Sequence, residues 1–346
     1  MEPKEFLLES NKKWASGMTF GGATPLAIKR FSTGVFALDV ALGGGWPFAR
    51  IAQVFGPESS GKTTLAKHAC ASAESYCHGC HRHKLVCDCK KFVPGRALFV
   101  DQEGNYDDNW ARCCGMTTEH HLIARPTTAE QSIDLICAAI DEKVVDVIVL
   151  DSIAAMTPAI ELEKSADEQQ MGAAARLINK FCRKVTSGLI AAGSAAPLCL
   201  FTNQIREKIG VMFGNPETVP GGNGQKFASA IRVRLGTPKI TDDVTDKLSA
   251  VMEAQGKTVK NKTYVPKMDF SFKLAVRAHE MWSLGEVQNA VDIYKCGKSL
   301  GLCGHKFNLG GEDLSFKLDS DAVQWLHDNP EKMKTLWDQC LERSFA

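Results

Sequence analysis

The segment from Gly56 to Thr63 constrains this chain more than any other, because it fits the phosphate-binding pattern G-x-x-x-x-G-K-[ST]. Residues 51–55 ahead of it are typical of a short buried strand, and residues 65–71 behind it are typical of the start of a helix. A strand, a glycine-rich turn and a helix N-terminus together point backbone N–H groups at a phosphate. Because both flanks fit, the segment predicts a nucleoside triphosphate site rather than a chance glycine turn.

The residues of this segment have distinct expected roles. The ammonium group of Lys62 would reach the β- and γ-phosphates, and the hydroxyl of Thr63 would hold Mg²⁺. The predicted cofactors are therefore ATP and Mg²⁺. The full set expected to contact the nucleotide in this segment comprises Gly56, Pro57, Glu58, Ser59, Ser60, Gly61, Lys62, Thr63 and Thr64.

Composition limits the classes of protein that fit. The 346 residues can bury a full core, and the net charge of +1 means that any binding to nucleic acid must come from local clusters. No apolar run is long enough to span a bilayer, and residues 1–5 are not typical of a signal peptide. Thirteen cysteines, an odd number, indicate reduced thiols rather than disulfides. We therefore expect a cytoplasmic protein with no membrane partner.

Strand-like and helix-like segments alternate between residues 31 and 235, which predicts an α/β fold with a mostly parallel sheet flanked by helices. The expected strands are 51–55, 97–100, 145–150, 198–202 and 230–235. The expected helices are 5–14, 64–76, 108–115, 128–141 and 171–188, with 321–327 and 331–342 near the end. The polar stretch 237–262 is either β-rich or irregular. We expect an N-terminal arm (1–30), an ATPase core (31–277) and a small C-terminal domain (278–346).

Polar side chains follow three of these strands, where an open α/β sheet binds its ligand. Asp151 ends one strand and can hold the hydration shell of Mg²⁺. Glu103 lies just past another strand and could polarise the attacking water, although a solvated loop acid is the alternative. Gln204 ends the third strand and could sense the γ-phosphate.

These segments resemble the RecA recombinases. The similarity includes residues 56–64, residues 147–155 and the group Met171-Gly172 with Ala174-Ala175-Arg176. It is most specific in residues 203–218, and it returns at 259–262 and 325–331. The resemblance implies a RecA-like ATPase core, and it covers residues 32–235 continuously.

The resemblance also implies roles for individual residues. Glu103 would activate water, and Gln204 would sense the γ-phosphate. Trp110 falls where the family usually has a Tyr that stacks on adenine, and Asp107 matches a nearby adenine contact. Lysines that reach the ATP of a neighbouring subunit would correspond to Lys260 and Lys262, although without the family match these would be read as solvated surface charge.

Residues 205–224 separate two strands without helical or strand periodicity, and a loop of this length is usually functional or disordered. Its cations can bind phosphates, and its apolar residues can stack between bases, which predicts a site for single-stranded DNA. A lid over ATP is the alternative, and both roles can hold because the loop follows Gln204. The expected DNA contacts in this loop are Arg206, Lys208, Gly210, Val211, Met212, Phe213, Gly214, Asn215, Gly221 and Gly222.

A second DNA loop is expected at residues 161–170, but it departs from the family pattern. Residues 164–167 replace the glycines of the bacterial proteins, and the net charge of the loop is negative. Met171 still occupies the position of an intercalating methionine, and Arg176 matches a DNA-contacting arginine. An exposed helical arginine is the alternative for Arg176.

An insertion follows the helix of the phosphate loop, where the family has a much shorter turn. Its C-x2-C and C-x-C pairs supply four thiolates for tetrahedral Zn²⁺. His78, His81 and His83 leave a Cys₃His set open, and a reduced cysteine-rich loop is the alternative to a metal site. The insertion (residues 77–96) could touch DNA or a partner protein, or serve only as a structural clip. The expected zinc ligands are Cys77, Cys80, Cys87 and Cys89.

The resemblance implies an ATP-dependent, nucleoid-associated recombinase that forms a filament on single-stranded DNA and pairs it with homologous duplex DNA. DNA would stimulate its ATP hydrolysis. One alternative is a regulatory relative that uses ATP as an assembly switch without strand exchange. Another is a hexameric DNA motor, against which the match over residues 203–222 weighs.

Overall fold

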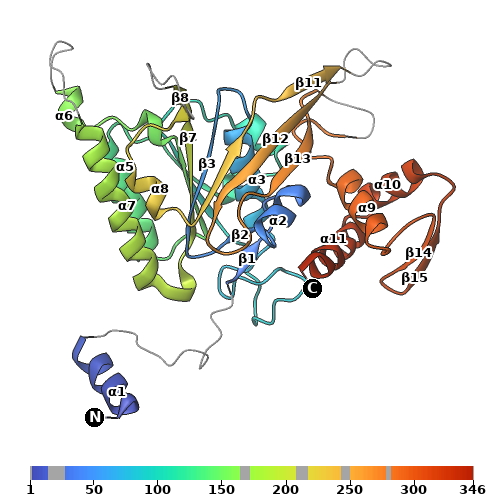
Figure 1. Cartoon of the computed structure of the whole chain (residues 1–346), viewed down its shortest axis with the longest axis horizontal. Coiled ribbons are helices and arrows are strands. Elements are labelled where there is room, and N and C mark those ends of the chain that lie inside the picture. The colour runs from blue at the N-terminus through green and yellow to red at the C-terminus, as the bar shows by residue number, and fades with distance from the viewer. Residues whose placement is uncertain are drawn as a thin grey trace.

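The computed structural model describes residues 2–14, 28–163, 172–207, 217–242, 250–277 and 282–345. Its centre is a nine-stranded sheet, counted over these residues, with the strand order β11-β12-β10-β3-β7-β6-β4-β5 and with β13 paired to β12 (Figure 1). The strands from β10 to β5 are parallel to one another, whereas β11, β12 and β13 pair antiparallel. The predicted α/β fold with a mostly parallel sheet is confirmed.

The central strands of the parallel sheet are buried on both faces, as expected when helices cover both sides of a sheet, whereas the edge strand β5 is largely exposed and β10 buries alternate residues. All five predicted strands form, with small shifts at their ends. The bounds of the parallel strands are β3 (Ile51–Gly56), β4 (Ala97–Asp101), β5 (Leu122–Ala124), β6 (Val147–Asp151), β7 (Leu198–Gln204) and β10 (Ile231–Leu235).

Successive strand residues face opposite layers, with the period of two that a pleated strand imposes. Val147 and Val149 of β6 pack in the core shared with α2 (Phe36–Leu42) and α3 (Lys62–Ala73). Ile148 and Leu150 pack in the core shared with α5 (Ala129–Asp141) and α7 (Ala173–Ala192). The sheet is therefore a middle layer between two helical layers (Figure 1).

Helix α7 is longer than predicted, because Gly188 lies inside it and does not end it. A Cβ atom at Gly188 would lie 3.2 Å from Cγ2 of Ile140, so the glycine permits close packing between α7 and α5. The helix ends instead after Ala192, at Gly193. The predicted end of this helix at residue 188 is therefore four residues too early, and the glycine is explained by contact with a neighbouring helix.

The polar stretch 237–262 is β-rich. It contains β11 (Lys239–Asp242) and the long β12 (Ala250–Asn261), which also pairs with β13 (Asp269–Ala275). None of the helices in the described part of the chain has both the length and the apolar character that a membrane span needs.

Residues beyond 282 build a third hydrophobic cluster, which includes Trp282, Ile293 and Trp337 and reaches Phe36 of the core. Both predicted helices near the chain end form, and a helix and a hairpin that the sequence pattern did not predict accompany them. These elements are α9 (Asn289–Ser299), β14 (Lys306–Leu309), β15 (Glu312–Ser315), α10 (Asp319–Asp328) and α11 (Pro330–Phe345).

The remaining described elements are short or terminal. They are α1 (Pro3–Trp14), β1 (Arg30–Phe31), β2 (Trp46–Pro47), α4 (Asp108–Cys113), α6 (Ala159–Leu162), β8 (Arg206–Glu207), β9 (Glu217–Thr218), α8 (Gly224–Ala228) and the 3₁₀ turns η1 (Thr118–His120), η2 (Ile153–Ala155) and η3 (Gly193–Ala195).

Gly285 joins the third cluster to the core at close range, and we expect Gly285→Ala to destabilise the protein. Its φ is +81°, and a Cβ atom there would lie 2.7 Å from the backbone of Cys113. Gly301→Ala is a matched control, because φ is +71° and nothing lies within 4 Å of the added Cβ. Urea denaturation should show Gly285→Ala to be the less stable by roughly 1–3 kcal/mol, the usual cost of overpacking. Equal losses in the two variants would show that backbone strain alone matters.

Candidate functional site

A cavity of about 260 Å³ lies at the carboxyl ends of the parallel strands. It brings together residues from the phosphate loop, from the ends of β4, β6 and β7, and from the antiparallel strands. The residues lining it are Glu58, Ser59, Ser60, Gly61, Lys62, Thr63, Thr64, Glu103, Trp110, Asp151, Gln204, Met252, Leu274 and Val276. Most of the predicted nucleotide contacts therefore share one cavity.

The phosphate loop runs from the end of β3 to the start of α3, and glycine is needed at both ends of the pattern. A Cβ atom at Gly56 would lie 2.7 Å from the carbonyl oxygen of Leu235, so β10 packs directly on this residue. Gly61 adopts the left-handed conformation, with φ +88°, immediately before α3 begins. Burial lowers the pKa of Lys62, and the nearby carboxylates of Asp151 and Glu103 oppose that shift. The loop thus holds the ammonium group of Lys62 beside the N-terminus of α3.

Asp151 lies at the end of β6 and is 5% exposed. Its Oδ2 accepts a hydrogen bond of 2.6 Å from the hydroxyl of Thr63, and its Oδ1 accepts one from Thr202. Burial raises the pKa of Asp151, whereas these two hydroxyl groups oppose the shift. The two predicted magnesium-site residues, Thr63 and Asp151, are therefore in direct contact.

Glu103 is held by two polar neighbours from other strands. Ser152 donates a hydrogen bond of 2.5 Å to Oε1 of Glu103, and the side-chain amide of Gln204 donates to the same oxygen at 3.3 Å. The two residues that sequence patterns predict to touch the γ-phosphate region thus contact each other. Ser152 was not predicted, because a serine after a strand carries no recognisable signal.

Trp110 faces the cavity from α4, and its Nε1 donates a hydrogen bond of 3.0 Å to Oγ1 of Thr64. Asp107 does not line the cavity and instead caps α4, accepting hydrogen bonds from the backbone N–H groups of Asn109 and Trp110. The buried Lys67 donates to the carbonyl of Asp107 at 2.9 Å. The carboxylate of Asp107 positions the helix that carries Trp110.

A chain of buried amides lies behind the cavity and was missed by sequence reasoning. Oε1 of Gln225 accepts hydrogen bonds from Gln53 of β3 and Asn203 of β7, at 2.5 and 2.8 Å. Arg232 of β10 donates to Oε1 of Gln53 at 2.7 Å. These contacts link three strands to α8, and the glutamines gave no signal because their partners are distant in sequence.

The long segment after Gln204 contains two short paired strands, which its lack of sequence periodicity did not indicate. β8 pairs antiparallel with β9, and α8 begins at Gly224. Among the expected DNA contacts, Arg206 is exposed on β8. Those that lie outside the described residues are Met171, Lys208, Gly210, Val211, Met212, Phe213, Gly214 and Asn215.

The end of this segment packs against the beginning of α7. A Cβ atom at Gly221, where φ is +90°, would lie 2.8 Å from Cδ1 of Ile178, and one at Gly222 would lie 3.5 Å from Ala175. Arg176 is the next residue along α7 and is exposed. The structure therefore brings Gly221, Gly222 and Arg176 together.

Lys260 and Lys262 lie on and just after β12, and β10 lies between β12 and β3, the strand from which the phosphate loop departs. Lys260 donates to the carbonyl oxygens of Lys226 and Phe227, and neither lysine lines the cavity of its own chain. Burial, together with the neighbouring charges of Lys262 and Arg232, lowers the pKa of Lys260.

The insertion gathers its four predicted metal ligands. The sulfur atoms of Cys77, Cys80, Cys87 and Cys89 all lie within 4.8 Å of one another. The distance between Sγ of Cys80 and Sγ of Cys87 is 3.7 Å. A tetrahedral site with Zn–S bonds of about 2.3 Å separates its sulfurs by about 3.8 Å. The geometry and the donor set both fit zinc.

Backbone N–H groups around the cluster favour thiolate. Burial raises the pKa of Cys77, but hydrogen bonds from the backbone of Val93, Cys80 and Gly79 outweigh it and lower the pKa to about 6. Crowding by the thiols of Cys80, Cys87 and Cys77 raises the pKa of Cys89 to about 12. Four thiolates at this spacing require a cation between them.

Asp146, just ahead of β6, fastens the insertion to the sheet. Its Oδ1 contacts Nε2 of His81 at 3.0 Å, and its Oδ2 contacts Nδ1 of His78 at 2.9 Å. The backbone N–H of Arg96 also donates to Oδ2. Both histidines are thus occupied by a carboxylate, which favours four cysteines over a Cys₃His set.

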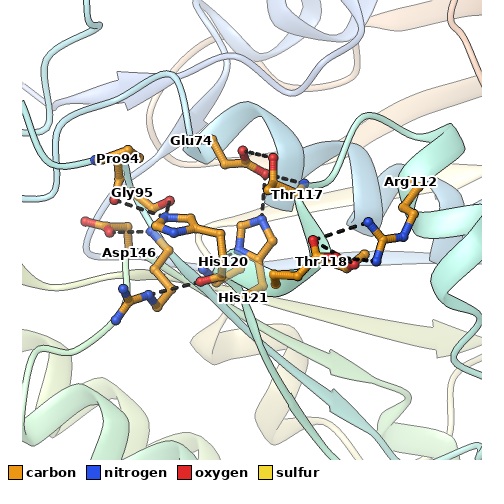
Figure 2. A network of polar contacts seen from close by, with 12 residues as sticks. Glu74, Pro94, Gly95, Arg112, Thr117, Thr118, His120, His121 and Asp146 are labelled. Carbon is orange, nitrogen blue, oxygen red and sulfur yellow. Dashed lines mark hydrogen bonds and ion pairs between the residues drawn. The ribbon is translucent and has the colours of Figure 1, made fainter.

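A second group of contacts secures the end of the insertion, as Figure 2 shows. Nδ1 of His121 accepts from the backbone N–H of Ala97 at 3.0 Å, so its Nε2 carries the proton and donates to Glu74 at 2.8 Å. Nε2 of His120 contacts the carbonyl oxygens of Pro94 and Gly95. The insertion is therefore joined to the core from both of its ends.

Comparison with known proteins agrees with this geometry. The model of the RecA N-terminal domain matches residues 6–278. The chain belongs to the RecA family. Protein RecA of Mesomycoplasma hyopneumoniae strain J is 34% identical over 347 residues, covering 98% of this chain and 94% of that protein. Protein RecA of Bdellovibrio bacteriovorus is 37% identical over 313 residues, covering 89% and 75%, and that of Acholeplasma laidlawii strain PG-8A is 34% identical, covering 95% and 92%.

The family match places the cysteine cluster inside a RecA core, because residues 77–96 lie within the matched range. The fold therefore accepts the insertion at the amino ends of β4 and β6, where it leaves the cavity at the opposite ends of these strands unobstructed.

We expect Asp146→Ala to destabilise the protein, because it leaves His78, His81 and the N–H of Arg96 without their shared acceptor. The expected loss is about 3 kcal/mol in the free energy of unfolding, the cost of removing hydrogen bonds to a buried charge. Asp134→Ala is the control, since that carboxylate is 77% exposed and pairs only with Lys184. Chemical denaturation measures both, and an Asp146→Ala variant as stable as the control would contradict the role of this clamp.

Proposed function

We propose that this chain is an ATP-dependent DNA recombinase that forms a filament on single-stranded DNA and pairs it with homologous duplex DNA. The observation that carries the proposal is the single cavity that joins Lys62, Asp151 and Glu103 to Gln204, the residue from which the segment 205–224 departs. The RecA family assignment supports the same activity.

The chemistry that we infer is positioning and charge stabilisation. Bound ATP with Mg²⁺ would supply the phosphoryl group and the charge that polarises it. Lys62 would hold the β- and γ-phosphates, while Thr63 and Asp151 would hold the metal. Glu103, oriented by Ser152, would accept a hydrogen bond from the attacking water.

The connection from ATP to DNA runs through β7. Gln204 contacts Glu103, whereas its neighbour Asn203 donates to the carbonyl of Pro220 at 3.1 Å. Gln225 also donates to the carbonyl oxygens of Pro220 and Gly222. A γ-phosphate on Gln204 would therefore shift the strand that holds both ends of the DNA segment, and hydrolysis would release it.

ATP hydrolysis measured with and without single-stranded DNA tests this function. We expect strong stimulation by DNA, and a decrease of roughly 10²–10⁴ in the stimulated rate for Glu103→Gln, the usual contribution of a general base. Glu142→Gln, an exposed carboxylate at the end of α5, should keep the wild-type rate. Hydrolysis that ignores DNA, or full turnover by Glu103→Gln, would contradict the proposal.

Filament assembly would complete the ATP site. Lys260 and Lys262 do not line the cavity of their own chain, so we propose that they reach the ATP of a neighbouring subunit. Hydrolysis would then depend on contact between subunits.

Mixing two inactive variants tests this arrangement. Lys62→Ala removes the phosphate contact but leaves the lysines of β12, whereas Lys260→Ala with Lys262→Ala does the reverse. We expect each variant alone to be inactive, and the mixture to regain ATPase activity, because one variant's lysines complete the other's intact phosphate loop. A mixture no more active than its components would show that the lysines act within one subunit.

We also propose that Cys77, Cys80, Cys87 and Cys89 hold one structural Zn²⁺. The close sulfur atoms and the fixed backbone around them support this assignment. Zinc would neutralise the crowded thiolates and close the loop between α3 and β4, which has few apolar contacts of its own.

Metal analysis of the purified protein should find about one zinc ion per chain. Cys87→Ser should lower that content and destabilise the insertion, whereas Cys137→Ser, a partly buried thiol of α5, should change neither. Less than roughly a tenth of an equivalent of zinc in the wild type would exclude the site, since a structural site of this type binds with an apparent 10–16 kcal/mol.

The remaining parts of the proposal follow the domain organisation. Residues 1–30 would form a packing arm, residues 31–277 the ATPase core and residues 278–346 a small domain, in a cytoplasmic, nucleoid-associated protein. No observation favours the regulatory switch or the hexameric motor over the recombinase.

A further inference from the structure

Three lysines of the insertion have no acidic partner among the described residues. Lys84, Lys90 and Lys91 are exposed, and no carboxylate of the described residues lies within ion-pair distance of them. Arg82, by contrast, pairs with Asp88 at 2.8 Å. The insertion stays net positive even when four zinc-bound thiolates are counted.

The metal cluster holds these lysines near one another. Lys84 lies three residues before Cys87, and Lys90 and Lys91 directly follow Cys89. A chain reaches about 3.6 Å per residue, so each lysine backbone lies within roughly 11 Å of a cluster cysteine. Lys90 and Lys91 are neighbours in sequence, and the cysteine sulfurs that flank them and Lys84 lie within 4.8 Å of one another, so we treat the three lysines as one cationic patch. We name Lys84, Lys90 and Lys91 the insertion patch.

The aromatic rings of the insertion are already engaged. His78 and His81 contact Asp146, and His81 also stacks on Phe48 with ring centroids 3.9 Å apart. His83 packs on Tyr76, and Phe92 is half-buried. Sites for single-stranded DNA rely on exposed rings that stack with bases, whereas a duplex presents a dense row of phosphates. The patch therefore fits a duplex backbone.

The position of the patch also separates it from the other DNA segment. The insertion docks at the amino ends of β4 and β6, whereas β8 and β9 follow the carboxyl end of β7. In Figure 1 the insertion, drawn in cyan, lies below the sheet, and β8 lies near the top. A strand bound along residues 205–224 would thus leave the patch free for a second DNA molecule.

We propose that the insertion patch binds the phosphate backbone of duplex DNA without regard to sequence. Leu85 and Val86, which are 57% and 65% exposed beside Lys84, would lie against the sugar edges of a groove. This inference rests on the proposed function and names the surface that meets the duplex partner.

Binding of a labelled duplex of random sequence, measured across a salt titration, tests the inference. The triple variant Lys84→Gln, Lys90→Gln and Lys91→Gln should bind more weakly, and its slope of log affinity against log salt should fall by about 2–3, since each phosphate contact contributes about 0.9. The matched control replaces Lys143, Lys180 and Lys306 by Gln. These exposed lysines lie elsewhere on the chain and form no ion pair within its described part, so the control should keep the wild-type slope.

Two further readouts separate this inference from the proposed function. Zinc content and ATP hydrolysis stimulated by single-stranded DNA should stay at wild-type levels in the triple variant. An unchanged duplex slope in a zinc-loaded, DNA-stimulated variant would overturn the patch alone, and so would an equal loss in the control. Weaker binding of single-stranded DNA with intact duplex binding would overturn it too. Absence of DNA-stimulated hydrolysis in the wild type would instead reject the recombinase.

Discussion

The buried carboxylate of Asp151 is the contact on which the rest of the site depends. It receives hydroxyl groups from α3 and β7 and so fixes the phosphate loop against the middle of the sheet. Burial without these partners would strongly disfavour its charge. The same contact keeps the two predicted magnesium-site residues together, and Glu103 follows β4 and Gln204 ends β7, the two strands that flank β6. The geometry of one carboxylate therefore sets the geometry of the whole cavity.

Strand β6 links the catalytic end of the sheet to the insertion. Asp151 is the last residue of the strand, and Asp146 is the residue immediately before the strand begins. At its carboxyl end the strand places Asp151 against Thr63 and Thr202, and just before its amino end Asp146 contacts two histidines of the insertion. Because a buried β-strand is stiff, the insertion adds a new surface without disturbing the cavity at the far end. A RecA core can in this way carry an added element that holds a four-cysteine cluster.

Buried amides serve a different purpose from buried carboxylates in this fold. Gln225, Gln53 and Asn203 carry no charge, so their burial costs less, and each has a partner. They connect the strand that carries Gln204 to the start of α8, at the end of the segment that we propose to bind DNA. A hydrogen-bonded chain of this kind has few alternative arrangements, so the strands and the helix that it joins would move as a unit.

The sequence by itself determined the fold class, the phosphate loop, the acids and amides at the strand ends, and the four cysteines of the insertion. These features are local. A glycine pattern, a strand followed by a polar residue, or a short cysteine spacing can be recognised from residues that are neighbours in the sequence. Only the tertiary structure decided that Ser152 holds Glu103, that Asp146 holds the insertion's histidines, and that Gly188 lies inside α7. Each of these depends on contact between segments that are dozens of residues apart in the sequence. Such contacts leave no periodic trace in a single sequence, because packing creates them and local backbone preference does not.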